Sequence, residues 1–234
     1  MGLNGTPRFE AGLIKAVLFD LDGTLLDTIA DLAAAANLMR NELGLADLPL
    51  ARISSFVGKG ADVLVHRTMT DDADGQLEAA AFKTARASFD RHYTEQNGLT
   101  AQPYPGVLEG LEKLRAAGLP MACVTNKPQA FTDPLLERQG LSRYFEHVLG
   151  GDALARKKPD PMPLLHLAGL FGLAPAHCLM VGDSVNDAQA ARAAGMPVLL
   201  VPYGYNEGLD VAGIDSDGIV SSLEQAALMV CSSK

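Results

Sequence analysis

Two carboxylates, Asp20 and Asp22, stand two residues apart, directly after the apolar run Ala16–Phe19 and before a Gly-Thr pair. Side chains at i and i+2 of a strand point the same way, so both acids are expected to leave a sheet on one side. A hard divalent ion such as Mg²⁺, which prefers oxygen ligands, would relieve their repulsion, and one carboxylate could then act as a nucleophile. An ordinary strand ending in a turn is the alternative, because Asp and Gly are common turn residues.

Reactive side chains follow three further segments of the chain. They are Thr125, Asn126 and Lys127 after the run 121–124, Lys157 and Lys158 after the weaker run 147–150, and Asp183 and Asp187 after the run 178–182. Taken singly, each group is explained by a helix cap or a solvated loop, where such residues are common. Ligands of open α/β sheets bind outside the carboxyl ends of the strands. The joint occurrence of these groups at four such ends therefore favours one shared site.

The residue types of this set suit phosphoryl transfer through a covalent aspartyl intermediate. A carboxylate nucleophile can approach an anionic phosphate only if Mg²⁺ and a cationic side chain neutralise the transferring oxygens. Asp20, Asp183 and a group from Asp22 could hold the metal. Thr125 could donate its hydroxyl to the phosphoryl oxygens, while Lys158 supplies a point charge. Asp22 could protonate the leaving oxygen and later deprotonate water.

The elements that must position these residues alternate between strands and helices. The runs 16–19, 119–124, 178–181 and 198–201 are apolar almost throughout, as strands buried on both faces are, and 147–150 is a weaker candidate. Helical patterns over 107–117, 161–171 and 185–194 each end at a glycine, and 222–230 forms a closing helix. This order predicts an α/β fold with a doubly wound parallel sheet.

Residues 27–98 interrupt that alternation, and their pattern predicts helices throughout. Thr28 with Asp31 resembles a capping box at the start of an Ala-rich helix that runs to Leu43. Further helices are expected near 61–69 and 74–96, before a Pro-Tyr-Pro-Gly segment marks the return to the α/β pattern. The pattern predicts a small α-helical cap domain, residues 27–98, inserted into a catalytic core of residues 1–26 and 99–234. Residues 1–13 are expected to form a flexible tail.

Composition limits the partners of this chain. A net charge of −9 and a pI near 5.0 argue against a nucleic-acid partner, which would require Lys and Arg facing phosphates. No signal peptide or membrane span is recognised, so a cytoplasmic location and no membrane partner are expected. Cys123 and Cys178 fall in predicted buried strands, without metal-ligand spacing. A small phosphorylated substrate is compatible with the acidic chain, since it responds to the local field of a pocket. Monomer and homodimer are both open.

The four groups of residues, taken in order, resemble the motifs of the haloacid dehalogenase superfamily. The matching segments are Asp20-x-Asp22-Gly-Thr, Thr125-Asn126, Lys158-Pro159 and Gly182-Asp183-Ser184-x-x-Asp187. The resemblance implies that Asp20 is the nucleophile, Asp22 the general acid and base, and Lys158 the charge neutraliser. It further implies that Thr125 and Asn126 contact phosphate, while Asp183 and the backbone carbonyl of Asp22 bind Mg²⁺. Asp187 would support the site from nearby.

Within this superfamily, residues 56–62, 103–107 and 201–205 resemble the phosphatases that act on phosphoglycolate. The resemblance implies a Mg²⁺-dependent hydrolase of a small phosphate monoester, with 2-phosphoglycolate as the leading candidate. Lys59 lies between Gly58 and Gly60, and has two interpretations: a loop cation lowered onto the substrate carboxylate as the cap closes, or an exposed residue at a helix start.

Rival functions remain open at this point. A sugar phosphomutase or a pyrophosphatase would keep the core chemistry and change the cap contacts. A signalling switch would instead hold phosphate on Asp20, but a general base two residues away should hasten the loss of that phosphate.

Overall fold

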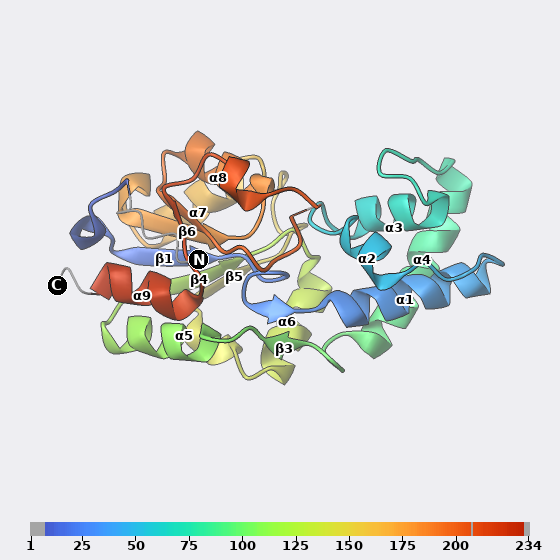
Figure 1. Cartoon of the computed structure of the whole chain (residues 1–234), viewed down its shortest axis with the longest axis horizontal. Coiled ribbons are helices and arrows are strands. Elements are labelled where there is room, and N and C mark those ends of the chain that lie inside the picture. The colour runs from blue at the N-terminus through green and yellow to red at the C-terminus, as the bar shows by residue number, and fades with distance from the viewer. Residues whose placement is uncertain (1–7, 207, 232–234) are drawn as a thin grey trace.

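The protein, described here by a computed structural model over residues 8–206 and 208–231, is built around a six-stranded parallel sheet of order β5-β4-β1-β6-β7-β8 (Figure 1). Its strands are β1 (Ala16–Phe19), β4 (Met121–Val124), β5 (His147–Leu149), β6 (Cys178–Gly182), β7 (Val198–Leu200) and β8 (Gly218–Ile219). The predicted strands are therefore confirmed, including the weak candidate at 147–150. The short β8 was not anticipated.

Helices cover both faces of this sheet, so the doubly wound α/β fold is confirmed (Figure 1). Val17 and Phe19 of β1 pack toward α5 (Val107–Ala116), α6 (Gln129–Arg138) and α9 (Leu223–Cys231). Ala16 and Leu18 pack toward α7 (Met162–Leu170) and α8 (Val185–Ala194). Short 3₁₀ helices complete this part of the chain: η1 (Ala11–Leu13), η2 (Ser142–Tyr144), η3 (Pro175–His177) and η4 (Val211–Gly213).

The order of the strands places β1 at the point where the direction of winding reverses. After β1 the chain builds β4 and β5 on one side, and then β6, β7 and β8 on the other. Phe19, the last residue of β1, lies in register with Cys123 of β4 and Val181 of β6. The residues that follow these three strands therefore emerge together at one edge, where ligands of such sheets bind.

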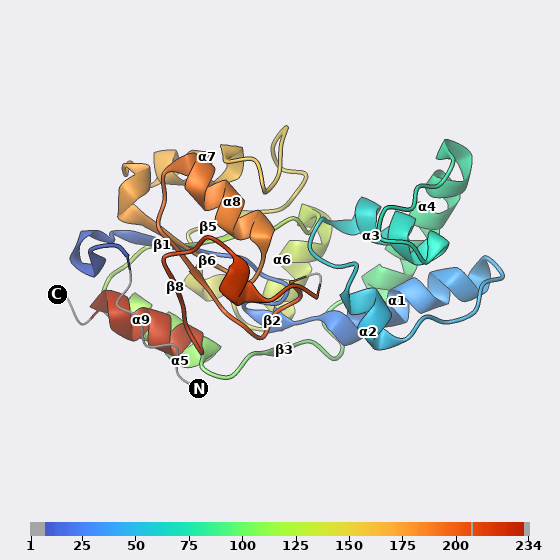
Figure 2. The same cartoon turned by 45° about the horizontal axis from the view of Figure 1, so that its top comes forward.

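The remaining helices form a second cluster beyond the carboxyl edge of the sheet (Figures 1 and 2). They are α1 (Ile29–Glu42), α2 (Leu50–Ser54), α3 (Ala61–Thr70) and α4 (Ala79–Gln96), and they share a hydrophobic core of their own. Phe131 and Tyr205 extend this core from the sheet side. The outgoing strand β2 (Leu26–Asp27) and the returning strand β3 (Gln102–Pro103) pair antiparallel. The assignment of residues 27–98 to a separate cap domain stays a prediction.

Two local predictions in this helical segment are wrong. Helix α4 begins at Ala79 rather than Asp74. The Leu77 N–H donates to Nδ1 of His66 at 3.0 Å instead of to a carbonyl one turn earlier, as it would in a helix. Thr28 and Asp31 do not form a capping box. The Thr28 hydroxyl donates instead to Asp22, and Asp31 accepts backbone N–H groups from the returning segment 98–101. Thr28 therefore connects the start of α1 to the turn after β1, and Asp31 connects it to the distant returning segment.

The start of the chain is packed against the core from residue 8 onward. The Arg8 N–H donates to the carbonyl of Asp217 at 3.1 Å, and Phe9 contacts the core of the α5, α6 and α9 face. The flexible tail predicted for residues 1–13 is thus contradicted for residues 8–13, and residues 1–7 lie outside the described part of the chain.

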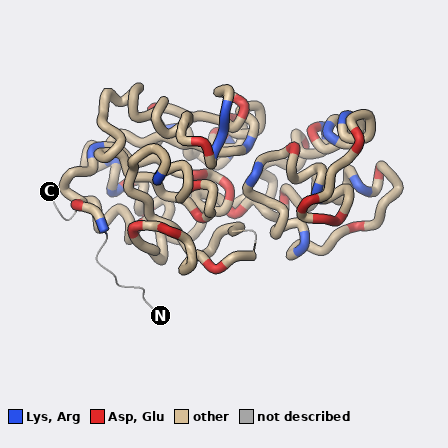
Figure 3. Tube along the Cα trace, turned by 90° about the horizontal axis from the view of Figure 1, so that it is seen from above, with Lys and Arg blue, Asp and Glu red and all other residues tan. Residues whose placement is uncertain are grey.

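Charge and hydropathy of the described residues bear on possible partners. In the part of the trace that Figure 3 colours, Lys and Arg positions are interspersed with Asp and Glu positions on the sheet part and the helical part alike. No described helix is both long enough and apolar enough to cross a bilayer.

Candidate active site

Asp20 leaves the end of β1 and meets the amine of Lys158. The Lys158 Nζ lies 2.9 Å from Asp20 Oδ1 and 2.7 Å from Oδ1 of Asp187, and it donates to the carbonyl of Val124 at 2.7 Å. The lysine is buried, so these three oxygens replace its hydration. The Leu21 N–H also donates to Asp20 Oδ1 at 2.7 Å. Sequence alone favoured Lys158 over Lys157 only by its Lys-Pro spacing, and the structure places Lys158 at the site.

Asp187 joins this site to the start of α8. Its Oδ2 accepts the Ser184 hydroxyl at 2.7 Å and the N–H groups of Ser184 and Asp183 at 3.1 and 3.3 Å, which completes a capping box. Gly182 permits this approach, because a Cβ there would stand 2.4 Å from the Asp187 carboxyl carbon. Asp187 thereby orients both Lys158 and the strand end that carries Asp183.

Asp183 extends from the end of β6 toward Asp20 and is held by two donors. Thr24 donates its hydroxyl to Oδ1 at 3.1 Å, and the Tyr205 N–H donates to Oδ2 at 2.6 Å. Gly204 passes so close that an added Cβ would lie 2.1 Å from Asp183 Oδ2. The segment around residues 204–205 therefore fixes the Asp183 carboxylate from behind.

Asp20, Asp183 and Asp187 form a buried acidic cluster in which one carboxylate oxygen from each residue lies within 4.8 Å of the other two. Burial raises the pKa of Asp20 to about 7, with Lys158 opposing that rise and Asp187 adding to it. Burial, followed by repulsion from Asp20 and Asp187, raises the pKa of Asp183 well above its ordinary value. Burial and mutual repulsion therefore disfavour the charged forms of these carboxylates, which a cation would stabilise, and an all-oxygen donor set fits a hard divalent cation such as Mg²⁺. Since Asp187 already binds Lys158 and caps α8, Asp20 and Asp183 are the better placed ligands.

Asp22 does not share this cluster through its carboxylate. Strand β1 ends at Phe19 and a turn follows, with Gly23 at φ +86°, so strand alternation no longer decides where Asp22 points. Its Oδ1 accepts the Thr28 hydroxyl at 2.7 Å and lies 2.9 Å from the Lys127 amine. We expected both acids to point the same way because both would belong to one strand. That reason is wrong, because Asp22 lies in the turn after the strand. Metal binding through the Asp22 backbone carbonyl stays a prediction.

Lys127 is the residue of this site to which sequence reasoning assigned no role. It is buried against Asp22, its amine donates to the hydroxyl of Tyr93 from α4, and the same amine lies 4.7 Å from the centre of the Tyr93 ring. One signal was present in the sequence. A lysine just before the start of a helix opposes the helix dipole, so a buried one there requires an anionic partner.

Thr125 and Asn126 follow β4 and line the same cavity as Asp20. The Thr125 hydroxyl accepts the Lys127 N–H at 3.1 Å. The side-chain amide of Asn126 donates to the carbonyls of Gly58 and Lys158, at 3.1 and 2.9 Å. Asn126 therefore connects the sheet to the loop between α2 and α3, and both N–H groups of its side-chain amide are used in doing so.

Lys59 lies in that loop, and two side chains beyond Asn126 also hold the loop. The Lys157 amine donates to the Lys59 carbonyl at 2.9 Å, and the Asn186 amide donates to the Gly58 carbonyl at 3.4 Å. Gly60, at φ +88°, lies so close that a Cβ there would stand 2.9 Å from the Asn126 carbonyl oxygen and from the Lys157 amine. Among the described residues, those lining the cavity do not include Lys59.

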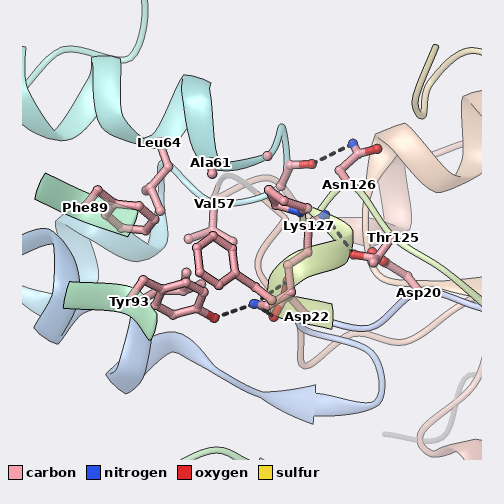
Figure 4. Close-up of a pocket in the computed structure, with 15 residues that line it drawn as sticks. Asp20, Asp22, Val57, Ala61, Leu64, Phe89, Tyr93, Thr125, Asn126 and Lys127 are labelled. Carbon is pink, nitrogen blue, oxygen red and sulfur yellow. Dashed lines mark hydrogen bonds and ion pairs between the residues drawn. The ribbon is translucent and has the colours of Figure 1, made fainter. Parts of the chain in front are cut away.

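A small cavity of about 50 Å³ lies between the carboxyl edge of the sheet and the helical cluster (Figure 4). Its polar wall carries Asp20, Asp22, Thr125, Asn126 and Lys127 from the strand ends, and its apolar wall comes mostly from the helical segment. The members of the apolar wall are Leu32, Val57, Ala61, Leu64, Phe89, Tyr93, Pro128 and Phe131, with Gly58 and Gly60 at the loop. The site therefore offers charge at one end and apolar surface at the other.

A doubly wound sheet with an acidic cluster, a threonine and a buried lysine at adjacent strand ends is typical of an α/β enzyme whose site lies at the switch point, where the cluster could hold a metal ion. Comparison with known proteins gives the family. The family model described as haloacid dehalogenase-like hydrolase matches residues 14–195, and the chain belongs to this family.

Several named relatives match almost the whole chain. The phosphoglycolate phosphatases of Thiobacillus denitrificans and Nitrosospira multiformis are each 54% identical over 217 residues, which is 93% of this chain and 96% of theirs. Among solved structures, a predicted phosphoglycolate phosphatase from Haemophilus somnus matches with a TM-score of 0.87 and 36% identity. The match covers 92% of this chain and 96% of the Haemophilus somnus chain.

Proposed function

We propose that this hydrolase cleaves 2-phosphoglycolate to glycolate and phosphate with Mg²⁺, through an acyl phosphate on the Asp20 carboxylate. The observation that carries the proposal is the arrangement around Asp20, with Lys158 at 2.9 Å from Oδ1 and Asp183 and Asp187 in the same acidic cluster. The choice of substrate is supported by relatives named phosphoglycolate phosphatase at 54% identity over 93% of the chain.

The first half of the proposed reaction forms the covalent intermediate. A carboxylate oxygen of Asp20 attacks phosphorus, and the bond to the leaving oxygen breaks while Asp22 gives that oxygen a proton. Lys158 stabilises the charge beside Asp20, and Thr125 donates its hydroxyl to a phosphoryl oxygen. Mg²⁺, held by Asp20, Asp183 and the backbone carbonyl of Asp22, would neutralise the phosphoryl oxygens during transfer.

The second half returns the enzyme to its starting state. Asp22, now ionised, takes a proton from water as the water oxygen attacks phosphorus, and Asp20 leaves as a carboxylate. Asp187 keeps Lys158 in place through both steps by its 2.7 Å contact. The apolar wall of the cavity limits the water that can reach phospho-Asp20.

Cellular context forms part of the proposal. We infer a cytoplasmic enzyme, acting as a monomer or homodimer on a small phosphorylated substrate. The acidic net charge of −9 supports the absence of a nucleic-acid partner.

Phosphate release from a panel of two phosphate monoesters and pyrophosphate tests the activity. The panel contains 2-phosphoglycolate, glucose 1-phosphate and pyrophosphate, each assayed with Mg²⁺ and with EDTA, using wild type and Asp20→Asn. Fastest release from 2-phosphoglycolate, loss of activity in EDTA and loss in Asp20→Asn are expected. Full activity in EDTA or in Asp20→Asn would refute the mechanism. A preference for pyrophosphate would identify pyrophosphate, and not 2-phosphoglycolate, as the substrate. Conversion of glucose 1-phosphate to 6-phosphate would indicate a mutase, and a phosphoprotein that persists for minutes would indicate a switch.

A further inference from the structure

Lys127 is the one lysine among the described residues that line the cavity beside Asp20. Its side chain is 3% exposed, and apolar side chains such as Leu32, Phe89 and Phe131 form much of the surrounding wall. An ammonium group in such surroundings is stable only with an anionic partner, because it has lost its water. Whatever anion enters this cavity therefore meets Lys127.

In the structure described, the partner of Lys127 is Asp22. The amine lies 2.9 Å from Asp22 Oδ1 and 3.3 Å from Oδ2, and Thr28 also donates to Oδ1 at 2.7 Å. Both carboxylate oxygens of Asp22 are thus engaged. In the proposed reaction Asp22 must deliver a proton to the leaving oxygen of the substrate, and it cannot do so while both oxygens are held by Lys127.

If Asp22 leaves Lys127, the buried amine needs a second anion. The phosphate of the substrate lies at Asp20, where Lys158 is the neighbouring cation, so the other end of the substrate occupies the remainder of the cavity. We propose that Lys127 binds the carboxylate of the phosphorylated acid, which replaces Asp22 as its partner, and that Lys127 thereby selects carboxylate-bearing monoesters. This inference rests on the proposed function and adds the residue responsible for substrate choice.

Tyr93 keeps the amine in place during such an exchange. Its ring packs against Phe89 at 5.3 Å and Phe131 at 5.0 Å between centroids, so its hydroxyl is rigidly placed beside the Lys127 amine. Figure 4 shows the Tyr93 hydroxyl on one side of this amine and Asp22 on the other, with Asp20 and Thr125 farther along the same wall. Because Tyr93 belongs to α4, the helical segment completes the specificity site by an uncharged contact, and Lys59 is not needed for it.

The test compares 2-phosphoglycolate with ethyl phosphate, which keeps the two carbons and the phosphate and has a methyl group in place of the carboxylate. Wild type should favour 2-phosphoglycolate by about 30-fold or more in kcat/KM, the effect of one buried charge pair. Lys127→Met should bring this ratio close to one, whatever happens to the absolute rates, and Lys127→Arg should restore part of it. Lys59→Met should keep the ratio, and Lys83→Met, at an exposed position of α4, is the matched control.

Tyr93→Phe provides a second variant with the same readout. It retains the ring and removes the hydroxyl, so it should raise KM for 2-phosphoglycolate more than KM for ethyl phosphate. A purely structural role of Tyr93 would change both substrates alike. This variant keeps the inference testable if Lys127→Met does not fold.

The possible failures are distinguishable. If wild type does not hydrolyse 2-phosphoglycolate, the proposed function fails and the inference fails with it. If wild type prefers 2-phosphoglycolate but Lys127→Met keeps the preference, or Lys59→Met abolishes it, only the inference is overturned.

Discussion

Replacing Lys158 by methionine should destabilise the metal-free protein by an amount that depends on pH. The substitution removes three contacts of the buried amine, to Asp20, Asp187 and the Val124 carbonyl, at 2.9, 2.7 and 2.7 Å. Methionine fills much of the space but offers no charge. Removing one partner of a buried ion pair costs about 3–5 kcal/mol, a large share of a typical unfolding free energy of about 5–15 kcal/mol.

The pH dependence follows from Asp20. Burial raises the pKa of Asp20 to about 7 even though the nearby Lys158 opposes that rise. Without Lys158 the pKa of Asp20 must rise further. Below about pH 7 folded Asp20 is protonated in both proteins, so their unfolding free energies change with pH in the same way. Above that pH only the variant still binds a proton in the folded state. Its unfolding free energy should therefore fall relative to wild type by about 1.4 kcal/mol per pH unit until the new pKa is reached.

Urea unfolding in EDTA at several values between pH 6 and 8.5 measures both effects. Lys113→Met is the matched control, since Lys113 pairs with Glu224 at 3.4 Å on the surface, where both side chains are 41% exposed. That pair should contribute at most about 1 kcal/mol at every pH. A destabilisation by Lys158→Met that stays below 1 kcal/mol, or that does not grow above pH 7, would refute the assignment of Lys158 as the counter-charge of Asp20.

Further predictions concern the acidic cluster. Gly204→Ala should weaken Mg²⁺ binding by roughly tenfold or more, because its Cβ would lie 2.1 Å from Asp183 Oδ2 and would displace a metal ligand. Calorimetric titration measures this, and Gly169→Ala in α7, where a Cβ has nothing within 4 Å, should leave affinity unchanged; equal affinity in both variants would contradict the role of Asp183. Mg²⁺ should raise the unfolding temperature more at pH 8 than at pH 5.5, since the raised pKa values of Asp20 and Asp183 mean that protons compete with the ion in acid. An equal rise at both pH values would count against a metal at these carboxylates.

Much of the core could be predicted because its signals are local. The run Ala16–Phe19 became β1 residue for residue, since continuous apolar residues specify a strand buried on both faces. Helix α8 began and ended as expected, because Ser184 and Gly195 supply the cap and the left-handed stop within the segment itself. Where a polar residue had two competing partners the local signal was misleading. Thr28 and Asp31 fit a capping box by spacing, yet each binds a more distant group.

The sequence alone determined most of the strands and helices of the core and which chemical groups stand at their ends. Parallel strands share one carboxyl edge, so the order of the motifs was sufficient to predict that Asp20, Thr125 and Asp183 would follow strands at the same edge. Tertiary structure alone decided which charge each carboxylate faces. Lys127 binds Asp22 across 105 residues, and Thr24 binds Asp183 across 159. Such pairings depend on turn geometry and burial rather than on spacing, because Coulomb attraction acts through space and becomes strong only where packing has removed the water.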